Sequence, residues 1–124
     1  MQYRFGIQII SYNRPQYLKQ TLESLMTVID KSQDKIAVIE QSDSNNQIKC
    51  IEICQQFENI SVYPIFTNLG QRGATNFLAS SGFWNDCDYI MLSDHDNIFH
   101  DSVSVYSDYL KNNSDIWITS GLIR

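Results

Sequence analysis

The stretch FGIQIISYNRP, residues 5–15, decides the fold class of this chain. Residues 5–12 are rich in isoleucine and predict a buried strand, and the Asn-Arg-Pro at its end is a turn that suits the start of a helix. Beyond it, apolar side chains recur at spacings of three and four, at Leu18, Leu22, Leu25, Met26 and Ile29. This spacing predicts a helix that ends near residues 30–33 and packs its apolar stripe on a sheet.

The alternation of strand and helix continues along the chain. Short apolar runs predict further strands over residues 36–40, 60–67, 88–93 and 116–119. Helices are predicted over residues 47–57, over residues 74–83 after a loop at 68–73, and from Asp101 or Ser102 onward. The expected inner faces are Ile48, Ile51 and Cys54 in the first of these helices and Val103, Tyr106 and Leu110 in the last.

Strands that alternate with helices indicate a mostly parallel sheet covered on both faces. We therefore expect an α/β chain with a three-layer α/β/α, Rossmann-like arrangement. Pro64 has no N–H to give to a neighbouring strand, so the strand at 60–67 is expected at an edge of the sheet. In such sheets ligands bind beyond the carboxyl ends of the strands, which here run into polar loops.

The composition limits the classes of protein that the chain can represent. Its 124 residues fit a single domain, 1–124, and 43% hydrophobic with 19% charged residues is enough apolar content for a core. A net charge of -5 argues against nucleic acid as a partner, because a polyanion needs clustered Lys and Arg. The three cysteines are an odd number without a C-x-x-C pair, which predicts reduced thiols. With no signal peptide or long apolar run, we expect a soluble, cytoplasmic protein that is at most peripheral to a membrane.

The stretch YIMLSDHDN, residues 89–97, carries the strongest sign of chemistry. An apolar strand delivers Asp94 and Asp96 to its carboxyl end, and such carboxylate oxygens suit Mn²⁺ or Mg²⁺, which in turn binds a diphosphate. The alternative is that both carboxylates only cap the turn and the next helix. His95 and His100 are either direct ligands or polar loop side chains, and the residues alone leave both alternatives open.

Several segments, in their order along the chain, together resemble glycosyltransferase family 2 and related GT-A enzymes. They are IISYNRP at 9–15, Leu18 with TLESL at 21–25, VIEQSD at 38–43, NLG at 68–70 with Asn76, and the D-x-D strand. Each is short, but their common order on the expected elements is specific. The resemblance implies the GT-A fold, here truncated after the D-x-D region.

The resemblance also implies where a nucleoside would bind. Ser11 and Tyr12 match the segment that lines the nucleoside pocket, where an aromatic ring stacks on the base; for Tyr12 the alternative is core packing. Glu40 matches an acidic residue that accepts a hydrogen bond from the base. The family usually has Asp there, so this chain departs from the pattern. Residues 39–43 also resemble the β-1,4-galactosyltransferase branch, which has Asn-Gln at similar positions.

The diphosphate and metal positions follow from the same resemblance. Asn68, Gly70 and Arg72 match the loop from which the family sends an Arg toward the base or the diphosphate; the alternative for Arg72 is a solvated loop charge. The family frequently has Ala-Arg-Asn where residues 74–76 read Ala-Thr-Asn, so that Arg is missing. Asp94 would bind the ribose or the metal, and Asp96 the metal.

The resemblance implies transfer of a sugar from a nucleoside-diphosphate sugar to the hydroxyl of a saccharide or lipid-linked acceptor, with inversion. The donor is expected to be a UDP-sugar, and Mn²⁺ or Mg²⁺ is expected to be bound during the reaction. The catalytic base of this family lies beyond the D-x-D strand, and Asp101, Asp108 and Asp115 are poor candidates for it. The chain thus resembles the front part of a larger catalytic domain. Peripheral membrane contact of the full-length protein and self-association through residues 116–123 are further expectations.

Two other functions stay open. One is a non-catalytic nucleotide-binding or interaction module, a remnant or fragment of such an enzyme. The other is a nucleotidyltransferase, which normally opens with a Gly-rich, basic phosphate loop. No such loop follows the first predicted strand.

Overall fold

The computed structural model describes residues 4–65, 67, 69–94, 99 and 111–112, with Gln71 and Asp94 described by their backbone alone. The described elements alternate from β1 to β4, with a helix between each pair of successive strands. The helix predicted from Asp101 or Ser102 onward and the strand predicted at 116–119 fall almost entirely outside this part of the chain.

The four described strands form one parallel sheet in the order β3-β2-β1-β4. They are β1 (Phe5–Ser11), β2 (Lys35–Glu40), β3 (Ile60–Pro64) and β4 (Tyr89–Asp94). The predicted parallel sheet is confirmed, since all three strand pairs run in the same direction. The edge position of β3 is also confirmed, and this strand ends at Pro64, whose ring nitrogen has no hydrogen to donate.

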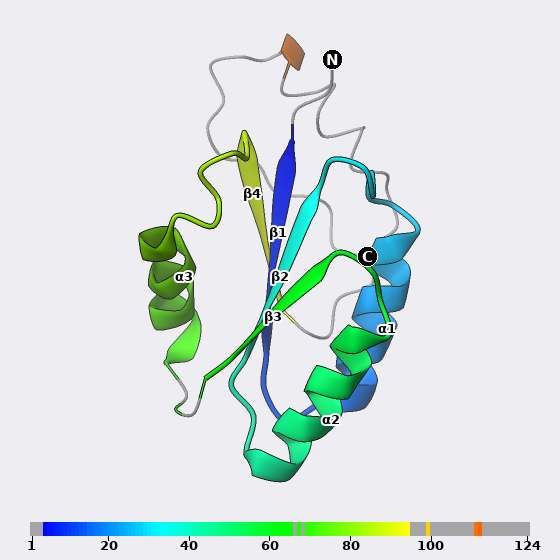
Figure 1. Ribbon diagram of the computed structural model, residues 1–124, viewed down its shortest axis with the longest axis vertical. Helices are drawn as coiled ribbons and strands as arrows, with labels where there is room; N and C mark the ends of the chain where they lie inside the picture. The colour runs from blue at the N-terminus through cyan, green and yellow to red at the C-terminus, as the bar shows by residue number, and fades with distance from the viewer. Residues whose placement is uncertain (1–3, 66, 68, 95–98, 100–110, 113–124) are drawn as a thin grey trace.

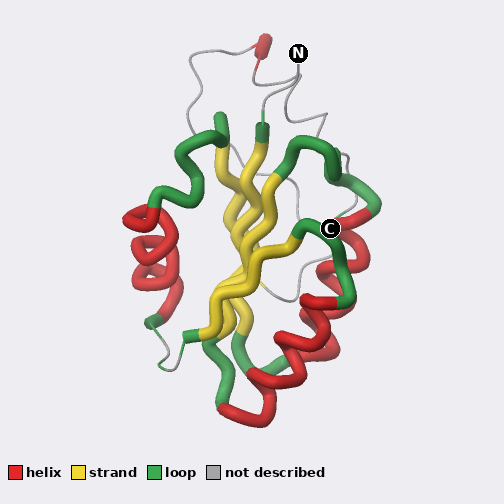
Figure 2. Tube along the Cα trace, in the orientation of Figure 1, coloured by secondary structure: helices red, strands yellow, loops and turns green. Residues whose placement is uncertain are grey.

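In the described part of the chain, three helices cover the sheet on its two faces: α1 (Pro15–Met26), α2 (Ser44–Gln55) and α3 (Gly70–Ser81). Figure 1 shows α1 and α2 on one side of the sheet and α3 on the other, and Figure 2 shows the same three layers by secondary structure. The expected α/β/α arrangement is therefore confirmed. Among the described helices, none is long and apolar enough to cross a bilayer.

Two clusters of buried side chains lie between these layers. One packs β1 and β2 against α1 and α2, and the other packs β2 against α3 and the segment that follows it. The larger cluster contains Phe5, Ile7, Ile9, Leu18, Leu22, Leu25, Val28, Ile36, Val38, Cys50 and Cys54. The smaller contains Ala37, Ile39, Ala74, Leu78 and Trp84. All three cysteines of the chain are free thiols, as predicted.

The predicted bounds of all three described helices were wrong. α1 ends at Met26 rather than near residues 30–33, because the next two backbone N–H groups bond three residues back in a tight turn: Thr27 N donates to Ser24 O and Val28 N to Leu25 O. α3 spans residues 70–81 rather than 74–83, because Gly82 adopts a left-handed conformation that closes the helix after Ser81.

The predicted inner face of α2 was partly wrong. The helix begins at Ser44, three residues before the predicted start, with Asp43 as its N-cap residue. Cys50 and Cys54 form its buried face, whereas Ile48 is 58% exposed. Polar residues such as Ser and Asn favour the first turn of a helix, and this tendency outweighed the apolar spacing on which the prediction relied.

The strand β4 is less buried than its apolar sequence predicted. Ile90 and Leu92 are 44% and 55% exposed. Ile90 pairs with Gly6, which lies against the Trp84 ring, and Leu92 pairs with Gln8, whose side chain donates to Thr75 Oγ1 in α3. These contacts lie on the α3 side of the sheet. The α3 layer therefore leaves this side of β4 open to solvent in the described structure.

Candidate functional site

The carboxyl ends of the strands bring several predicted site residues to one edge of the sheet. Ser11 pairs with Glu40 at the ends of β1 and β2, and Ile10 pairs with Asp94 at the end of β4. Helices α1, α2 and α3 each begin just after a strand that ends at this edge. Tyr12, Gly70 and Arg72 follow these strand ends and belong to the same region. The predicted location of the site at this edge is consistent with the fold.

At the end of β1, the side chains of Ser11 and Tyr12 differ in accessibility. Ser11 is fully buried, and its Oγ donates a weak hydrogen bond to Cys50 Sγ at 3.8 Å. Its hydroxyl therefore faces the core under α2 and is not available to a ligand. Tyr12 is 41% exposed, which leaves part of its ring free to stack on a flat partner.

At the end of β2, Glu40 is completely buried. Its Oε1 accepts a hydrogen bond of 2.7 Å from Ser42 N, while its Oε2 has no partner within the described residues. An unpaired buried acceptor costs about 1–3 kcal/mol, so an N–H or O–H supplied to this oxygen would be favourable. Burial, followed by the nearby Glu40 carboxylate, raises the pKa of Cys50 to about 11. The Cys50 thiol beside Glu40 is therefore neutral at pH 7.

Gln41 is a structural link that the sequence did not reveal. It is buried, its backbone N donates to Ser11 O at 2.9 Å, and its Oε1 accepts from Leu69 N at 2.5 Å. This one residue joins β1, β2 and the start of α3. No sequence signal could have found it, because a glutamine after a strand does not specify which distant loop it will contact.

Asn13 is the second link between loops at this edge. Its Nδ2 donates to Asp43 Oδ2 at 3.0 Å, and its Oδ1 accepts from Asp43 N at 2.8 Å. Its backbone has a φ of 55°, in the left-handed region that Asn tolerates better than most residues. The Asn-Arg-Pro turn signal identified the turn but not this cross-loop contact.

The residues predicted to bind diphosphate and metal are only partly described. Gly70 is the first residue of α3 and has a φ of 70°, and Arg72 is exposed in the first turn of that helix. Asp94 ends β4, whereas Asn68, His95 and Asp96 lie outside the described residues. In the part of the chain that the structure describes, no three His, Cys, Asp or Glu side chains are grouped so that they could hold a metal ion.

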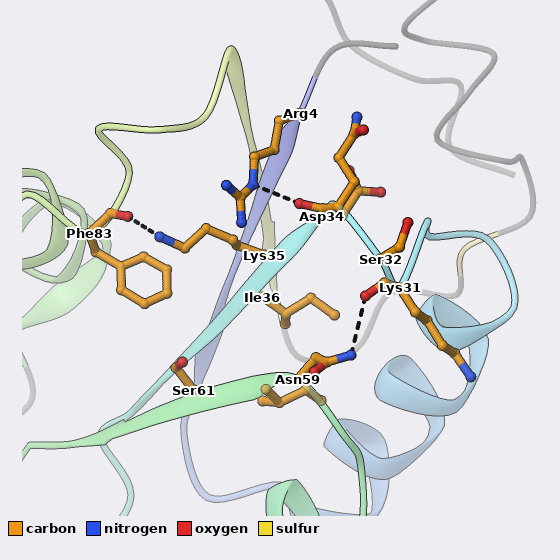
Figure 3. Close-up of a pocket in the computed structure, with 11 residues that line it drawn as sticks. Arg4, Lys31, Ser32, Asp34, Lys35, Ile36, Asn59, Ser61 and Phe83 are labelled. Carbon is orange, nitrogen blue, oxygen red and sulfur yellow. Dashed lines mark hydrogen bonds between the residues drawn. The ribbon is translucent and has the colours of Figure 1, made fainter. Parts of the chain in front are cut away.

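A separate hollow of about 340 Å³ lies at the opposite, amino end of the strands (Figure 3). Lys35 Nζ donates to Phe83 O at 2.6 Å and to Asp86 Oδ1 at 3.0 Å, and the Arg4 guanidinium donates to Asp86 Oδ2 at 2.7 Å. These contacts tie the segment after α3 to the starts of β1 and β2. None of the predicted site residues that the structure describes lines this hollow.

Comparison with solved structures shows what the fold is similar to. The crystal structure of S. aureus TarS matches 90% of this chain with a TM-score of 0.72 and 17% identity, and the chain covers 20% of it. The crystal structure of S. aureus TarS 1–349 also matches over 90% of this chain, with a TM-score of 0.59 and 19% identity, and is covered to 31%. The chain therefore spans less than a third of either structure.

The sequence comparisons identify the family. A search of curated proteins found no significant match. The model of the family described as Glycosyl transferase family 2 matches residues 7–118, which is most of the chain and includes all the predicted site residues. The chain therefore belongs to glycosyl transferase family 2, and its fold is the GT-A fold that the resemblance implied.

Proposed function

We propose that this chain forms the donor-binding part of an enzyme that transfers a sugar from a nucleoside-diphosphate sugar to an acceptor hydroxyl, with inversion. The observation that carries the proposal is the meeting of Tyr12, Glu40 and Asp94 at one edge of the sheet, in a chain of this family. The proposed donor is a UDP-sugar and the proposed acceptor is a saccharide or a lipid-linked acceptor.

The nucleoside would be bound by residues that follow β1 and β2. The exposed part of the Tyr12 ring would stack on the base, and Ser11 would contribute only its main chain because its hydroxyl is buried. Glu40 Oε2, the buried oxygen without a partner in the described structure, would accept an N–H of the base. Because Glu40 has no exposed surface, this contact requires the turn at residues 41–43 to shift when the nucleoside binds.

The diphosphate would be bound at the start of α3. Arg72 is exposed there, and its planar guanidinium can donate two hydrogen bonds to one phosphate. The Leu69 N-cap makes no side-chain capping bond, so the partial positive charge of the helix N-terminus adds to that of Arg72. Asn68 and Gly70 flank this position in the sequence. The start of α3 thereby offers local positive charge on a chain whose net charge is -5.

Asp94 and Asp96 would hold the divalent cation. Their carboxylates are the hard oxygen ligands that Mn²⁺ and Mg²⁺ prefer, and Asp94 ends a strand beside Ile10 of β1, at the edge where the diphosphate would lie. When bound, the metal supplies Lewis-acid stabilisation of the charge that develops on the departing diphosphate. The catalytic base is not assigned, and Asp101, Asp108 and Asp115 lie outside the described residues.

A donor-binding module without transfer activity is the second candidate. It would bind the donor through the same residues at the carboxyl edge of the sheet, without a group that removes the acceptor proton. Both candidates bind the donor. Transfer of radiolabelled sugar to an acceptor by this chain would favour the enzyme, and binding without transfer would favour the module.

The role of Arg72 tests the proposed donor site. We expect Arg72→Ala to weaken UDP binding about tenfold or more and to leave uridine binding unchanged, because only the diphosphate contacts the guanidinium. Calorimetric titration of both ligands would measure this difference. Lys31→Ala is the matched control, because Lys31 is an exposed cation at the hollow on the amino end of the sheet. Equal losses for both ligands, or an equal effect of Lys31→Ala, would refute this assignment.

A further inference from the structure

The geometry points to Asn13 as a positioning residue of the donor site, which fixes the loop after β1 against the loop after β2. The inference rests on the proposed function and adds a residue to it. Three hydrogen bonds join the loops: Asn13 N donates to Ser42 Oγ at 2.7 Å, Asn13 Nδ2 donates to Asp43 Oδ2 at 3.0 Å, and Asp43 N donates to Asn13 Oδ1 at 2.8 Å. Both ends of the Asn13 amide are therefore used.

The backbone conformation explains why the identity of this side chain matters. The φ of 55° at position 13 is a left-handed conformation, which glycine adopts with the least backbone strain. Helix α1 does not use the Asn13 amide as a cap, because its N-cap residue is Arg14 and has no side-chain capping bond. The asparagine side chain at this position therefore serves the cross-loop contact rather than the turn or the helix.

The contact joins the two parts of the proposed nucleoside site. Tyr12 immediately precedes Asn13, and Ser42, which accepts from Asn13 N, donates its own backbone N–H to Glu40 Oε1. The position of the Tyr12 loop is thus coupled to the turn that covers Glu40. A ligand that needs both loops in place would bind more weakly if each loop had to be ordered separately.

The same geometry indicates that Asn13 contributes more to ligand binding than to folding. Its two side-chain bonds to Asp43 are exposed to solvent, and water replaces such bonds at little cost when the chain unfolds. The buried clusters under α1 and α2 do not include Asn13 or Asp43. Loss of the contact should therefore affect affinity while leaving the fold intact.

The test compares glycine variants of the chain's two non-glycine residues with left-handed backbones in the described structure. Asn13→Gly keeps the backbone conformation and the bond from the backbone N of residue 13 to Ser42 Oγ, and it removes only the side-chain bonds to Asp43 and Asn46. We expect this variant to weaken UDP and uridine binding by about tenfold. Asn59→Gly is the control: Asn59 has a φ of 67° and donates to Lys31 O at 3.3 Å, at the amino end of the sheet. It should leave both affinities unchanged. Calorimetry gives the affinities, and thermal melting should shift no more for Asn13→Gly than for Asn59→Gly.

A charge swap provides the rescue. Asn13→Asp places two carboxylates together and should weaken binding, whereas Asn13→Asp combined with Asp43→Asn restores a donor and an acceptor to the pair and should recover most of the affinity. Unchanged affinity of Asn13→Gly, or no recovery in the double variant, overturns the positioning role and leaves the proposed function standing. If the wild-type chain binds neither ligand, the proposed function fails, and with it the site that Asn13 would position.

Discussion

At the scale of single residues, the burial of Glu40 decides how the nucleoside site can work. Its carboxylate is enclosed by Ser42, Cys50 and the strand ends, and one oxygen lacks a partner in the described structure. A structural carboxylate would need that oxygen satisfied from within the fold. The unused acceptor is the feature that favours a ligand contact.

Glu40→Gln tests that contact with little change in volume. In the variant, the amide oxygen can still accept the hydrogen bond from Ser42 N. The amide NH₂ group takes the place of Oε2, so that two donors, this group and the N–H of the base, would face each other. We therefore expect Glu40→Gln to weaken uridine and UDP binding about tenfold and to leave the melting temperature nearly unchanged. Unchanged uridine affinity would show that Glu40 has only a structural role.

The sequence predicted these residues unevenly, for physical reasons. The position of Glu40 at the end of a strand followed from the apolar run before it, but its complete burial depended on how closely α2 packs over it. Gln41 and Asn13 act through contacts with Leu69 and Asp43, which are far away in the sequence. Residue type and spacing carry no information on such pairs.

At the scale of elements, the apolar periodicity predicted the strands and helices and their order, while the polar residues at their ends shifted the bounds. A tight turn at Thr27 and Val28 ends α1 early, and the polar residues from Ser44 onward start α2 early. The exposed face of β4 could not be predicted from its apolar sequence, because burial depends on how far α3 extends over the sheet.

The coupling of β2 to α3 through Gln41 gives a prediction at this scale. Gln41→Ala removes the acceptor for Leu69 N, whereas Gln41→Glu keeps an oxygen in reach of it. We expect faster hydrogen exchange at the Leu69 amide in Gln41→Ala, by about fivefold or more, and near wild-type exchange in Gln41→Glu. Exchange rates measured by nuclear magnetic resonance would show this, and equally fast exchange in both variants would mean that another group protects the amide.

At the scale of the whole molecule, the functional features separate to the two ends of the sheet. The carboxyl ends bring together the residues proposed to bind a nucleotide-sugar, and the amino ends carry the hollow with its Arg4, Lys35 and Asp86 ion pairs. Exposed apolar side chains of the described strands lie at Ile90 and Leu92. The segment 116–123, from which self-association was expected, lies outside the described residues.

We propose that the carboxyl edge of the sheet binds a nucleoside diphosphate together with a divalent cation. The direct test is calorimetric titration of UDP into the chain, first with Mn²⁺ and then with EDTA. The variant is Asp94→Asn, at the carboxyl end of β4, and the matched control is Asp88→Asn, a carboxylate that precedes the same strand. We predict that Mn²⁺ strengthens wild-type and Asp88→Asn binding by about tenfold or more and that Asp94→Asn loses this gain. Equal UDP affinity of the wild-type chain with Mn²⁺ and with EDTA would contradict the claim.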